Sequence, residues 1–260
     1  MASIDNAGAR LFYRIDGKAD GPPLVLLNSL GSGTGLWDPV MPALGAKYRV
    51  LRTDKRGHGQ SSGTPGNYSM PMLAADVLAV MDAAGFERAT VGGISIGGMI
   101  SMQLALAAPE RVERLIVSNS SAFPGDRLRA RMAEVRENGL EPVADGVIRN
   151  WFSASTIAAG GPYIDAVRAT FVGGEPQGYI GCCAAIIDFD LRESLAKISQ
   201  PALVIAGLSD ASLTPEHSRE VAAALPDARL VELPALHIPF GDMPAEYARA
   251  VIDFLGPENL

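Results

Sequence analysis

Short apolar runs alternate along this chain with longer stretches whose apolar positions recur at helical spacing. The runs with the composition of strands span residues 23–28, 48–54, 89–93, 114–119, 201–207 and 229–233. Most of them are apolar throughout, which is typical of strands covered on both faces. Residues 10–16 alternate between apolar and polar positions instead, which indicates an edge strand. The pattern predicts an α/β protein with a mostly parallel central sheet flanked by helices.

Amphipathic stretches fill the intervals between these strands. Helices are predicted over residues 70–84, where Gly85 follows as a C-terminal cap, and over residues 96–108 and 245–255. Residues 120–199 separate two strands by far more than the dozen or so residues that a crossover needs. Periodic stretches at 127–138 and 142–152 predict helices within that interval. We therefore expect a helical cap (124–195) inserted after the sixth core strand, and a core formed by residues 1–123 and 196–260.

Composition and charge narrow the classes of function. The chain has 260 residues and a net charge of -7, so it lacks the basic surface that binds a phosphate backbone, and nucleic acid is not expected as a partner. It contains no apolar run of about 18 residues and no signal-peptide pattern at its start, which predicts a cytoplasmic protein and no membrane partner. Cys182 and Cys183 are adjacent, so we expect them to be reduced and packed, and no metal site is predicted.

One segment carries a recognisable chemical motif, because Gly93-Ile94-Ser95-Ile96-Gly97 joins a predicted strand directly to a predicted helix. In this context G-x-S-x-G is a nucleophile elbow, in which a sharp turn exposes the serine hydroxyl. A glycine-rich turn with an incidental serine, or a phosphate-binding loop, is the alternative. The second of these is disfavoured because neither G-x-G-x-x-G nor a following Walker lysine is present. Ser95 is the predicted nucleophile.

A serine nucleophile needs a general base, and the chain offers only His58, His217 and His237. In α/β hydrolases the order along the chain is Ser, then Asp or Glu, then His, so His58 comes too early. His217 belongs to a predicted helix start, whereas His237 follows the last predicted strand in a short loop. The base is therefore predicted to be His237.

The acid that orients this base should follow an earlier strand. Asp210 does so after strand 201–207, whereas strand 114–119 has no acid at its end. The alternative role for Asp210 is a helix N-cap ahead of Thr214. For the oxyanion hole, the fold supplies the backbone N–H after the nucleophile, here Ile96, and one from the loop after an early strand, for which we select Leu30. The turn over residues 54–61 is interpreted as structural.

Several segments resemble one family, the 3-oxoadipate enol-lactonases. They include Asn28-Ser29-Leu30-Gly31 with Trp37-Asp38, the Arg56-Gly57-His58-Gly59 turn, the elbow, and in the cap Arg149-Asn150-Trp151-Phe152, residues 178–186 and residues 188–192. The resemblance covers nearly the whole chain. It departs at Ile96, where Met is more usual, and after His237, where Ile-Pro-Phe-Gly-Asp replaces a segment that more often carries Glu.

This resemblance implies hydrolysis, without a cofactor, of the lactone formed late in catechol and protocatechuate breakdown. Ser95, Asp210 and His237 fall on the family's triad. The substrate is a small anionic lactone, so a cation near the cap is expected to bind its carboxylate, and Trp151 is a candidate substrate contact or a core residue. The candidate cations on the cap are Arg127, Arg129, Arg131, Arg136 and Arg149.

Other functions share the elbow. Within enzymes they are carboxylesterases, carbon–carbon bond hydrolases of ring-cleavage products and cofactor-free haloperoxidases. Outside enzymes, a scaffold of this fold can act as a small-molecule receptor. Oligomeric state does not follow from the pattern of residues.

Overall fold

The structure is a computed structural model that describes residues 2–123 and 128–256. Eight strands form one sheet in the order β1-β2-β4-β3-β5-β6-β7-β8. The strands are β1 (Ala2–Asn6), β2 (Ala9–Gly17), β3 (Pro23–Leu27), β4 (Arg49–Thr53), β5 (Ala89–Ile94), β6 (Val112–Ser118), β7 (Ala202–Gly207) and β8 (Ala228–Leu233). The six strands from β3 to β8 pair in parallel, and β1 and β2 are antiparallel to their neighbours. This arrangement confirms the predicted mostly parallel sheet.

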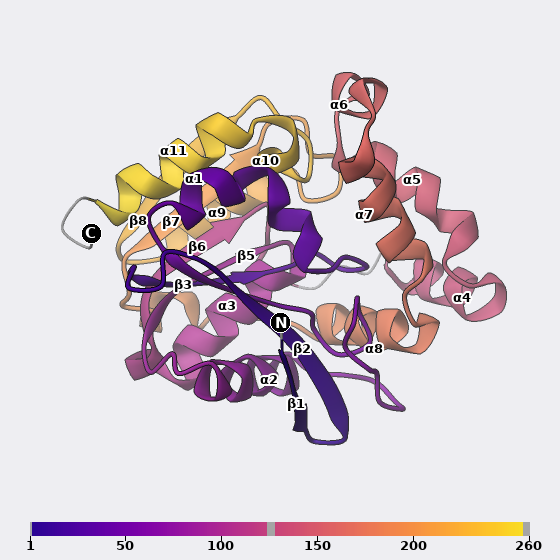
Figure 1. Cartoon of the computed structure of the whole chain (residues 1–260), viewed down its shortest axis with the longest axis horizontal. Coiled ribbons are helices and arrows are strands. Elements are labelled where there is room, and N and C mark those ends of the chain that lie inside the picture. Colours follow the sequence, from indigo (N-terminus) through magenta and orange to yellow (C-terminus); the bar gives the residue numbers. More distant parts are fainter. Residues whose placement is uncertain (1, 124–127, 257–260) are drawn as a thin grey trace.

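Helices cover both faces of the sheet (Figure 1). Those outside the cap are α1 (Met41–Gly45), α2 (Met70–Ala83), α3 (Ile96–Ala107), α9 (Pro215–Ala224), α10 (Pro239–Asp242) and α11 (Pro244–Leu255), with short 3-10 helices η1 (Thr34–Val40), η2 (Pro109–Arg111) and η3 (Leu195–Lys197). On one face α2 packs beside α3, and on the other α1 packs beside α11. The Ser69 hydroxyl caps α2 by accepting from the N–H of Met72 (3.3 Å), and Gly85 follows its end with φ 69°.

One strand was not predicted. Residues 10–16 were expected to form the edge of the sheet, but β2 lies between β1 and β4, and β1 forms the edge. β1 has no hydrophobic periodicity that would identify it, because it has five residues and none of its side chains is fully buried. The alternation in the half of β2 toward Gly17 does not mark a solvent-exposed polar face, because Arg14 and Asp16 are part-buried in ion pairs and Ile15 is exposed.

A helical insert follows β6, as predicted. Within the described residues it contains α4 (Leu128–Asn138), α5 (Glu141–Trp151), α6 (Ala154–Ala159), α7 (Pro162–Val172) and α8 (Pro176–Ile187). These helices lie at one end of the sheet, at the right in Figure 1, where the parallel strands have their carboxyl ends. Cys182 and Cys183 are free and buried in α8. The division into core and cap with the boundaries given above stays a prediction.

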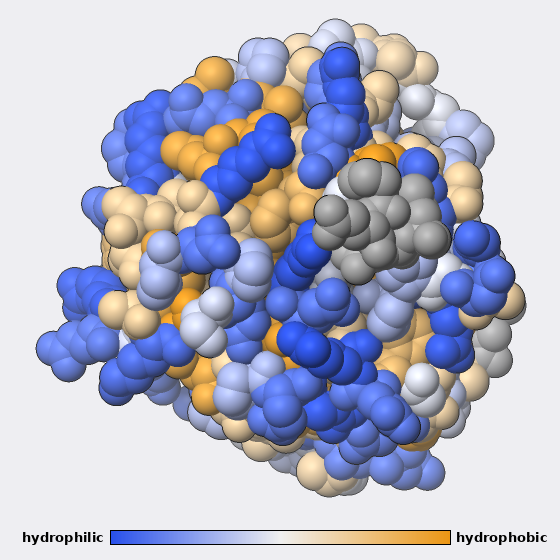
Figure 2. Space-filling view, turned by 90° about the vertical axis from the view of Figure 1, so that its left-hand side faces the viewer, coloured by the Kyte–Doolittle hydropathy of each residue, from blue (hydrophilic) through white to orange (hydrophobic). Residues whose placement is uncertain are grey.

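One face of the molecule lies away from the insert and is turned toward the viewer in Figure 2. Figure 2 shows hydrophilic and hydrophobic residues mixed over that face. Ile15 and Leu208 are the exposed large hydrophobic residues among those described. In the described part of the chain no helix has the length and apolar character needed to cross a membrane.

The junction of β5 with α3 depends on two glycines. A Cβ atom on Gly93 would lie 2.1 Å from the backbone carbon of Gly97, and one on Gly97 would lie 2.3 Å from the carbonyl oxygen of Leu27. Both obstacles are backbone atoms, which cannot move without shifting a strand or a helix. Strand β5 can therefore enter α3 within one residue only where these positions lack side chains.

We predict that Gly93→Ala lowers the free energy of unfolding by at least ~2 kcal/mol, because a methyl group there overpacks a rigid backbone contact. The matched control is Gly146→Ala in α5, where an added Cβ meets no atom within 4 Å. That change should raise the free energy of unfolding by ~0.5–1 kcal/mol, since Ala is the better helix former. Urea unfolding followed by circular dichroism measures both variants, and equal stability of the two would contradict the steric argument.

Candidate active site

Ser95 occupies the single residue between β5 and α3. Its backbone lies at φ 58° and ψ -122°, a conformation that side-chain-bearing residues rarely adopt. The strained turn is held by hydrogen bonds on both sides: the N–H of Ser95 donates to the oxygen of Ser118 (3.0 Å), and the hydroxyl of Ser120 donates to the oxygen of Ser95 (2.8 Å). The geometry is that of a nucleophile elbow.

His237 and Asp210 lie on the same edge of the sheet as Ser95. Asp210 follows β7, His237 follows β8, and Nδ1 of His237 lies 2.7 Å from Oδ2 of Asp210. Both residues are 3 % exposed. The other oxygen of Asp210 accepts the N–H groups of Ser212 (2.7 Å) and Leu213 (3.0 Å). The structure therefore joins the predicted base to the predicted acid.

The ionised form of Asp210 is favoured despite its burial. Burial alone would raise the pKa of this carboxyl, but the adjacent His237 and the hydrogen bonds that it receives lower the pKa below its ordinary value. The carboxylate can thus fix the histidine tautomer with a proton on Nδ1, which leaves Nε2 free to accept a proton.

Asn119 is a site residue that the sequence analysis missed. Its side-chain amide donates to Oδ2 of Asp210 (2.9 Å), and its side-chain oxygen accepts the N–H of Gly207 (3.1 Å). It follows β6 directly and has φ 38°, a conformation that Asn tolerates better than most residues. Asn119 is an amide and not an acid, so it was not predicted to orient the histidine. Its position at the carboxyl end of a strand is the signal that could have identified it.

One cavity of about 740 Å³ has both Ser95 and His237 on its wall. Its size is that of a small-molecule site. Leu30 also lines it, and in the described chain the N–H of Leu30 has no hydrogen-bond partner. Ile96 begins α3, so its N–H belongs to the first helical turn, where amides lack an intrahelical acceptor. The two predicted oxyanion donors are thus unengaged, as that role requires, and the role itself stays a prediction.

The cap contributes the opposite wall of the cavity. Trp151 at the end of α5 lines it, and its indole is also buried against Phe152 and Phe171 in T-shaped contacts, so it is both core and lining. Arg131 on α4 is the one Arg or Lys among the described residues of the cavity wall. Arg129, Arg136 and Arg149 are exposed and do not line the cavity.

Arg127, the fifth candidate cation, lies outside the described residues. Arg131 interacts with the buried Tyr179 of α8, and both residues line the cavity. A carboxylate, Glu134, lines the cavity one turn further along α4. The cap therefore presents both signs of charge to a ligand.

The two remaining histidines have different surroundings. His58 is buried, its Nε2 finds no partner within the described structure, and burial lowers its pKa well below the ordinary value. It does not line the cavity. His217, which the sequence analysis set aside as part of a helix start, does line the cavity and stacks on Phe123 with ring centroids 5.1 Å apart. It is a candidate ligand contact.

Comparisons with known proteins agree with this geometry. Residues 22–156 match the alpha/beta hydrolase fold family. The chain belongs to the α/β-hydrolase family. As an α/β hydrolase, it has the predicted fold, in which the helical insert follows β6.

Three relatives of this α/β hydrolase indicate the range of activities nearby. The 3-oxoadipate enol-lactonase 2 of Acinetobacter baylyi is 35% identical over 243 residues, which cover 93% of this chain and 91% of that protein. The proposed carbamate hydrolase RutD of Azorhizobium caulinodans is 36% identical over 240 residues, 90% of this chain and 89% of that protein. The crystal structure of the enol-lactonase from Burkholderia xenovorans LB400 superposes with a TM-score of 0.94 at 37% identity, covering 98% of this chain and 99% of that one.

We predict that Asp210→Asn lowers kcat by about 10³- to 10⁴-fold, because a neutral amide would hold His237 in the wrong tautomer and leave its cation unpaired. Hydrolysis of a p-nitrophenyl ester at pH 7.5 measures the effect. The matched control is Asp190→Asn, which removes an exposed carboxylate that pairs with Arg192 outside the cavity. Its kcat should equal that of the wild type, and a comparable loss in both variants would argue against the role of Asp210.

Proposed function

We propose that this α/β hydrolase opens 3-oxoadipate enol-lactone to 3-oxoadipate through an acyl-enzyme on Ser95. The observation that carries the proposal is the placement of Arg131 on the wall of the cavity that Ser95 and His237 share. A carboxylate-bearing lactone needs a cation at a distance from the reacting carbonyl, and this acidic chain presents one there. Two relatives with enol-lactonase activity in their names support the substrate class.

In the proposed reaction His237 takes the proton of Ser95 as the serine oxygen attacks the lactone carbonyl. The N–H groups of Leu30 and Ile96 stabilise the negative charge on the tetrahedral oxygen. The ring C–O bond then breaks, and the leaving enolate is protonated and becomes a ketone, which is a poor nucleophile and does not reclose the ring. Water, activated by His237, then hydrolyses the acyl-enzyme. No cofactor takes part in these steps, and the proposed setting is cytoplasmic aromatic catabolism, the β-ketoadipate pathway.

Carbamate hydrolysis is the second candidate, because a relative assigned to it matches this chain as well as an enol-lactonase does. The chemistry at Ser95 would be the same acyl transfer. A cavity of about 740 Å³ exceeds the volume of either substrate. The lactone is favoured because it carries a free carboxylate away from the reacting carbonyl, which Arg131 on the cavity wall can bind. A wider carboxylesterase function would use the same site with less demand for a cation, whereas a carbon–carbon bond hydrolase of ring-cleavage products would also meet a substrate with a carboxylate.

The decisive experiment is turnover of enol-lactone, a small carbamate and a neutral p-nitrophenyl ester by the wild type and by Ser95→Ala. We expect the lactone to have the highest kcat/KM of the three substrates. In Ser95→Ala the kcat/KM for the lactone should fall by at least about 10³-fold, since the nucleophile is removed. Labelling of the wild type by a fluorophosphonate tests the non-enzymatic receptor function. Full lactone turnover by Ser95→Ala, or no labelling and no turnover by the wild type, would sink the proposal.

The carboxylate contact is tested by Arg131→Met. We expect KM for the anionic lactone to rise about 10- to 100-fold, the worth of a charge-assisted hydrogen bond, while KM for a neutral lactone of similar size changes less than about twofold. Arg136→Met is the matched control on the same helix, because Arg136 is exposed and does not line the cavity. If Arg131→Met raises KM equally for the anionic and the neutral lactone, Arg131 supports the cap and does not recognise the carboxylate.

A further inference from the structure

The carbonyl oxygen of Ser29 receives three hydrogen bonds, which is more than a loop carbonyl needs. The donors are Nζ of Lys55 (2.6 Å), the hydroxyl of Ser32 (2.8 Å) and the N–H of Ser32 (3.3 Å). This carbonyl belongs to the same peptide group as the N–H of Leu30, and that group is planar and trans. Donors that fix the direction of the C=O bond therefore also fix the direction of the N–H bond at the cavity wall.

A buried lysine is an unusual donor for the carbonyl oxygen of a loop residue such as Ser29. It follows β4, its side chain is buried, and the residue is 8 % exposed. Among the described residues Nζ has no carboxylate within ion-pair distance, and its hydrogen bond goes to the oxygen of Ser29. The adjacent Asp54 carboxylate instead accepts the N–H groups of Thr34 (2.6 Å) and Gln60 (2.9 Å). Burying an ammonium without an ion-pair partner has a large desolvation free energy. A neutral donor would hold the loop without that penalty.

We propose that Lys55 is a positioning residue of the oxyanion hole, whose ammonium orients and polarises the Ser29–Leu30 peptide so that the Leu30 N–H donates more strongly to the developing oxyanion. The inference rests on the proposed hydrolase function, in which Leu30 supplies one of the two donors. It also changes the interpretation of the turn over residues 54–61, which the sequence analysis took as purely structural.

The physical reason is the resonance of the amide. A cation on the carbonyl oxygen stabilises the form with a C–O⁻ oxygen and a positive nitrogen, and this makes the N–H a stronger donor. The hydroxyl of Ser32 can orient the same carbonyl but adds no charge. In a site of low dielectric the buried positive charge also attracts the oxyanion itself through the peptide.

The charge on Lys55 is titratable within the working range of a hydrolase. Burial lowers the pKa of Lys55 to about 8, although the neighbouring Cys182 and Asp54 oppose this shift. The titratable groups that face the ammonium are Asp54 beside it, His58 in the same turn and Cys182 on α8. Burial lowers the pKa of His58 and raises the pKa of Cys182 to about 12. Between pH 7 and 10 Lys55 is therefore the group of this set that changes its charge, and it loses its proton as pH rises.

The test is the pH profile of kcat for p-nitrophenyl acetate, a substrate without a titrating group, in the wild type, Lys55→Met and Ser32→Ala. We expect wild-type kcat to fall above about pH 8. At pH 7, Lys55→Met should lose about 10- to 100-fold in kcat, less than removal of a whole oxyanion donor costs, with KM within about twofold. Its profile should lack the alkaline fall. Ser32→Ala should lose less than about threefold and keep that fall at the same pH.

Each result separates this inference from the proposed function. A flat wild-type profile between pH 7.5 and 9.5 overturns the role of Lys55 without any variant, even if Lys55→Met fails to fold. The role is also overturned if Lys55→Met keeps the alkaline fall or if Ser32→Ala loses as much as Lys55→Met. Turnover by Ser95→Ala would instead reject the hydrolase mechanism itself. Thermal unfolding of each variant at pH 7 confirms that the comparison is made on folded protein.

Discussion

The backbone of Ser95 is the constraint on which the rest of the site depends. A residue with a side chain at φ 58° and ψ -122° costs on the order of 1–3 kcal/mol, and the fold must supply that energy locally. It does so through the hydrogen bonds from Ser95 to Ser118 and from Ser120 to Ser95. The N–H groups of Gly98 and Met99 also donate to the carbonyl oxygen of Ser95, the first carbonyl of α3. Relaxing the turn would break all of these bonds at once.

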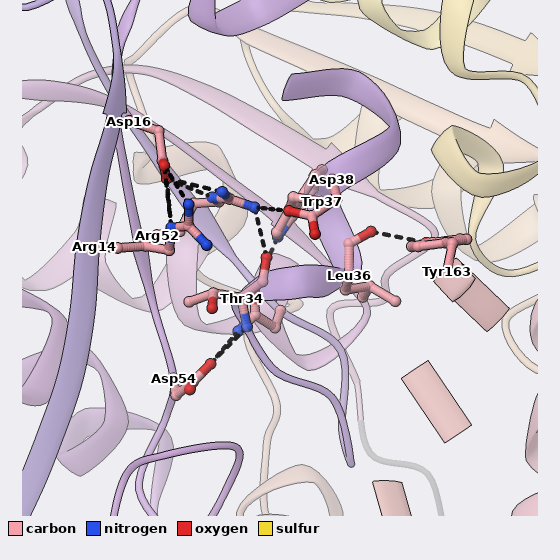
Figure 3. A network of polar contacts seen from close by, with 10 residues as sticks. Arg14, Asp16, Thr34, Leu36, Trp37, Asp38, Arg52, Asp54 and Tyr163 are labelled. Carbon is pink, nitrogen blue, oxygen red and sulfur yellow. Dashed lines mark hydrogen bonds and ion pairs between the residues drawn. The ribbon is translucent and has the colours of Figure 1, made fainter. Parts of the chain in front are cut away.

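The loop that carries Leu30 is held by a different kind of force, namely buried charge. Figure 3 shows Arg52 between Asp16 and Asp38. One nitrogen of Arg52 donates to the backbone oxygen of Thr34 (2.9 Å), and the Asp54 carboxylate accepts the N–H of Thr34. Arg52 is almost fully buried, so losing either carboxylate partner would leave a poorly solvated charge. The network fixes η1, where the loop ends, from both sides.

The same loop connects to the cap and to the histidine. The hydroxyl of Tyr163 on α7 donates to the oxygen of Leu36 (2.8 Å), and the ring of Trp37 stacks on Phe240 at 4.0 Å, three residues after His237. The N–H of Ile238 donates to the oxygen of Trp151 in the cap. The loop that carries Leu30, the segment that follows His237 and the cap thus share contacts, so a displacement of the cap would shift both Leu30 and His237.

Much of this arrangement could be predicted from the sequence because it rests on local signals. The G-x-S-x-G spacing placed Ser95. Chain order and the position after the last predicted strand selected His237, and the end of strand 201–207 selected Asp210. The structure brings the side chains of His237 and Asp210 within 2.7 Å. The position of β1 could not be predicted in this way, because an exposed five-residue strand has no periodic signature. Asn119 escaped because its role depends on a side-chain contact across 91 residues of chain.

The arginines of the cap show why the ligand-facing cation of the site could not be predicted from the sequence. Arg129, Arg131 and Arg136 lie on one helix within eight residues. Helical periodicity places Arg129 and Arg136 on one face and Arg131 on another, without saying which face meets the cavity. Only the packing of α4 against α8 decides that, and it selects Arg131 beside Tyr179.

Lys55 presents the same difficulty, since a lysine in a turn is normally solvated and nothing in the spacing of residues 54–61 predicts that its ammonium turns inward. Both proposed roles place a local cation in a chain with net charge -7. Local burial, and not overall composition, therefore determines whether an anionic ligand or an oxyanion finds a positive charge.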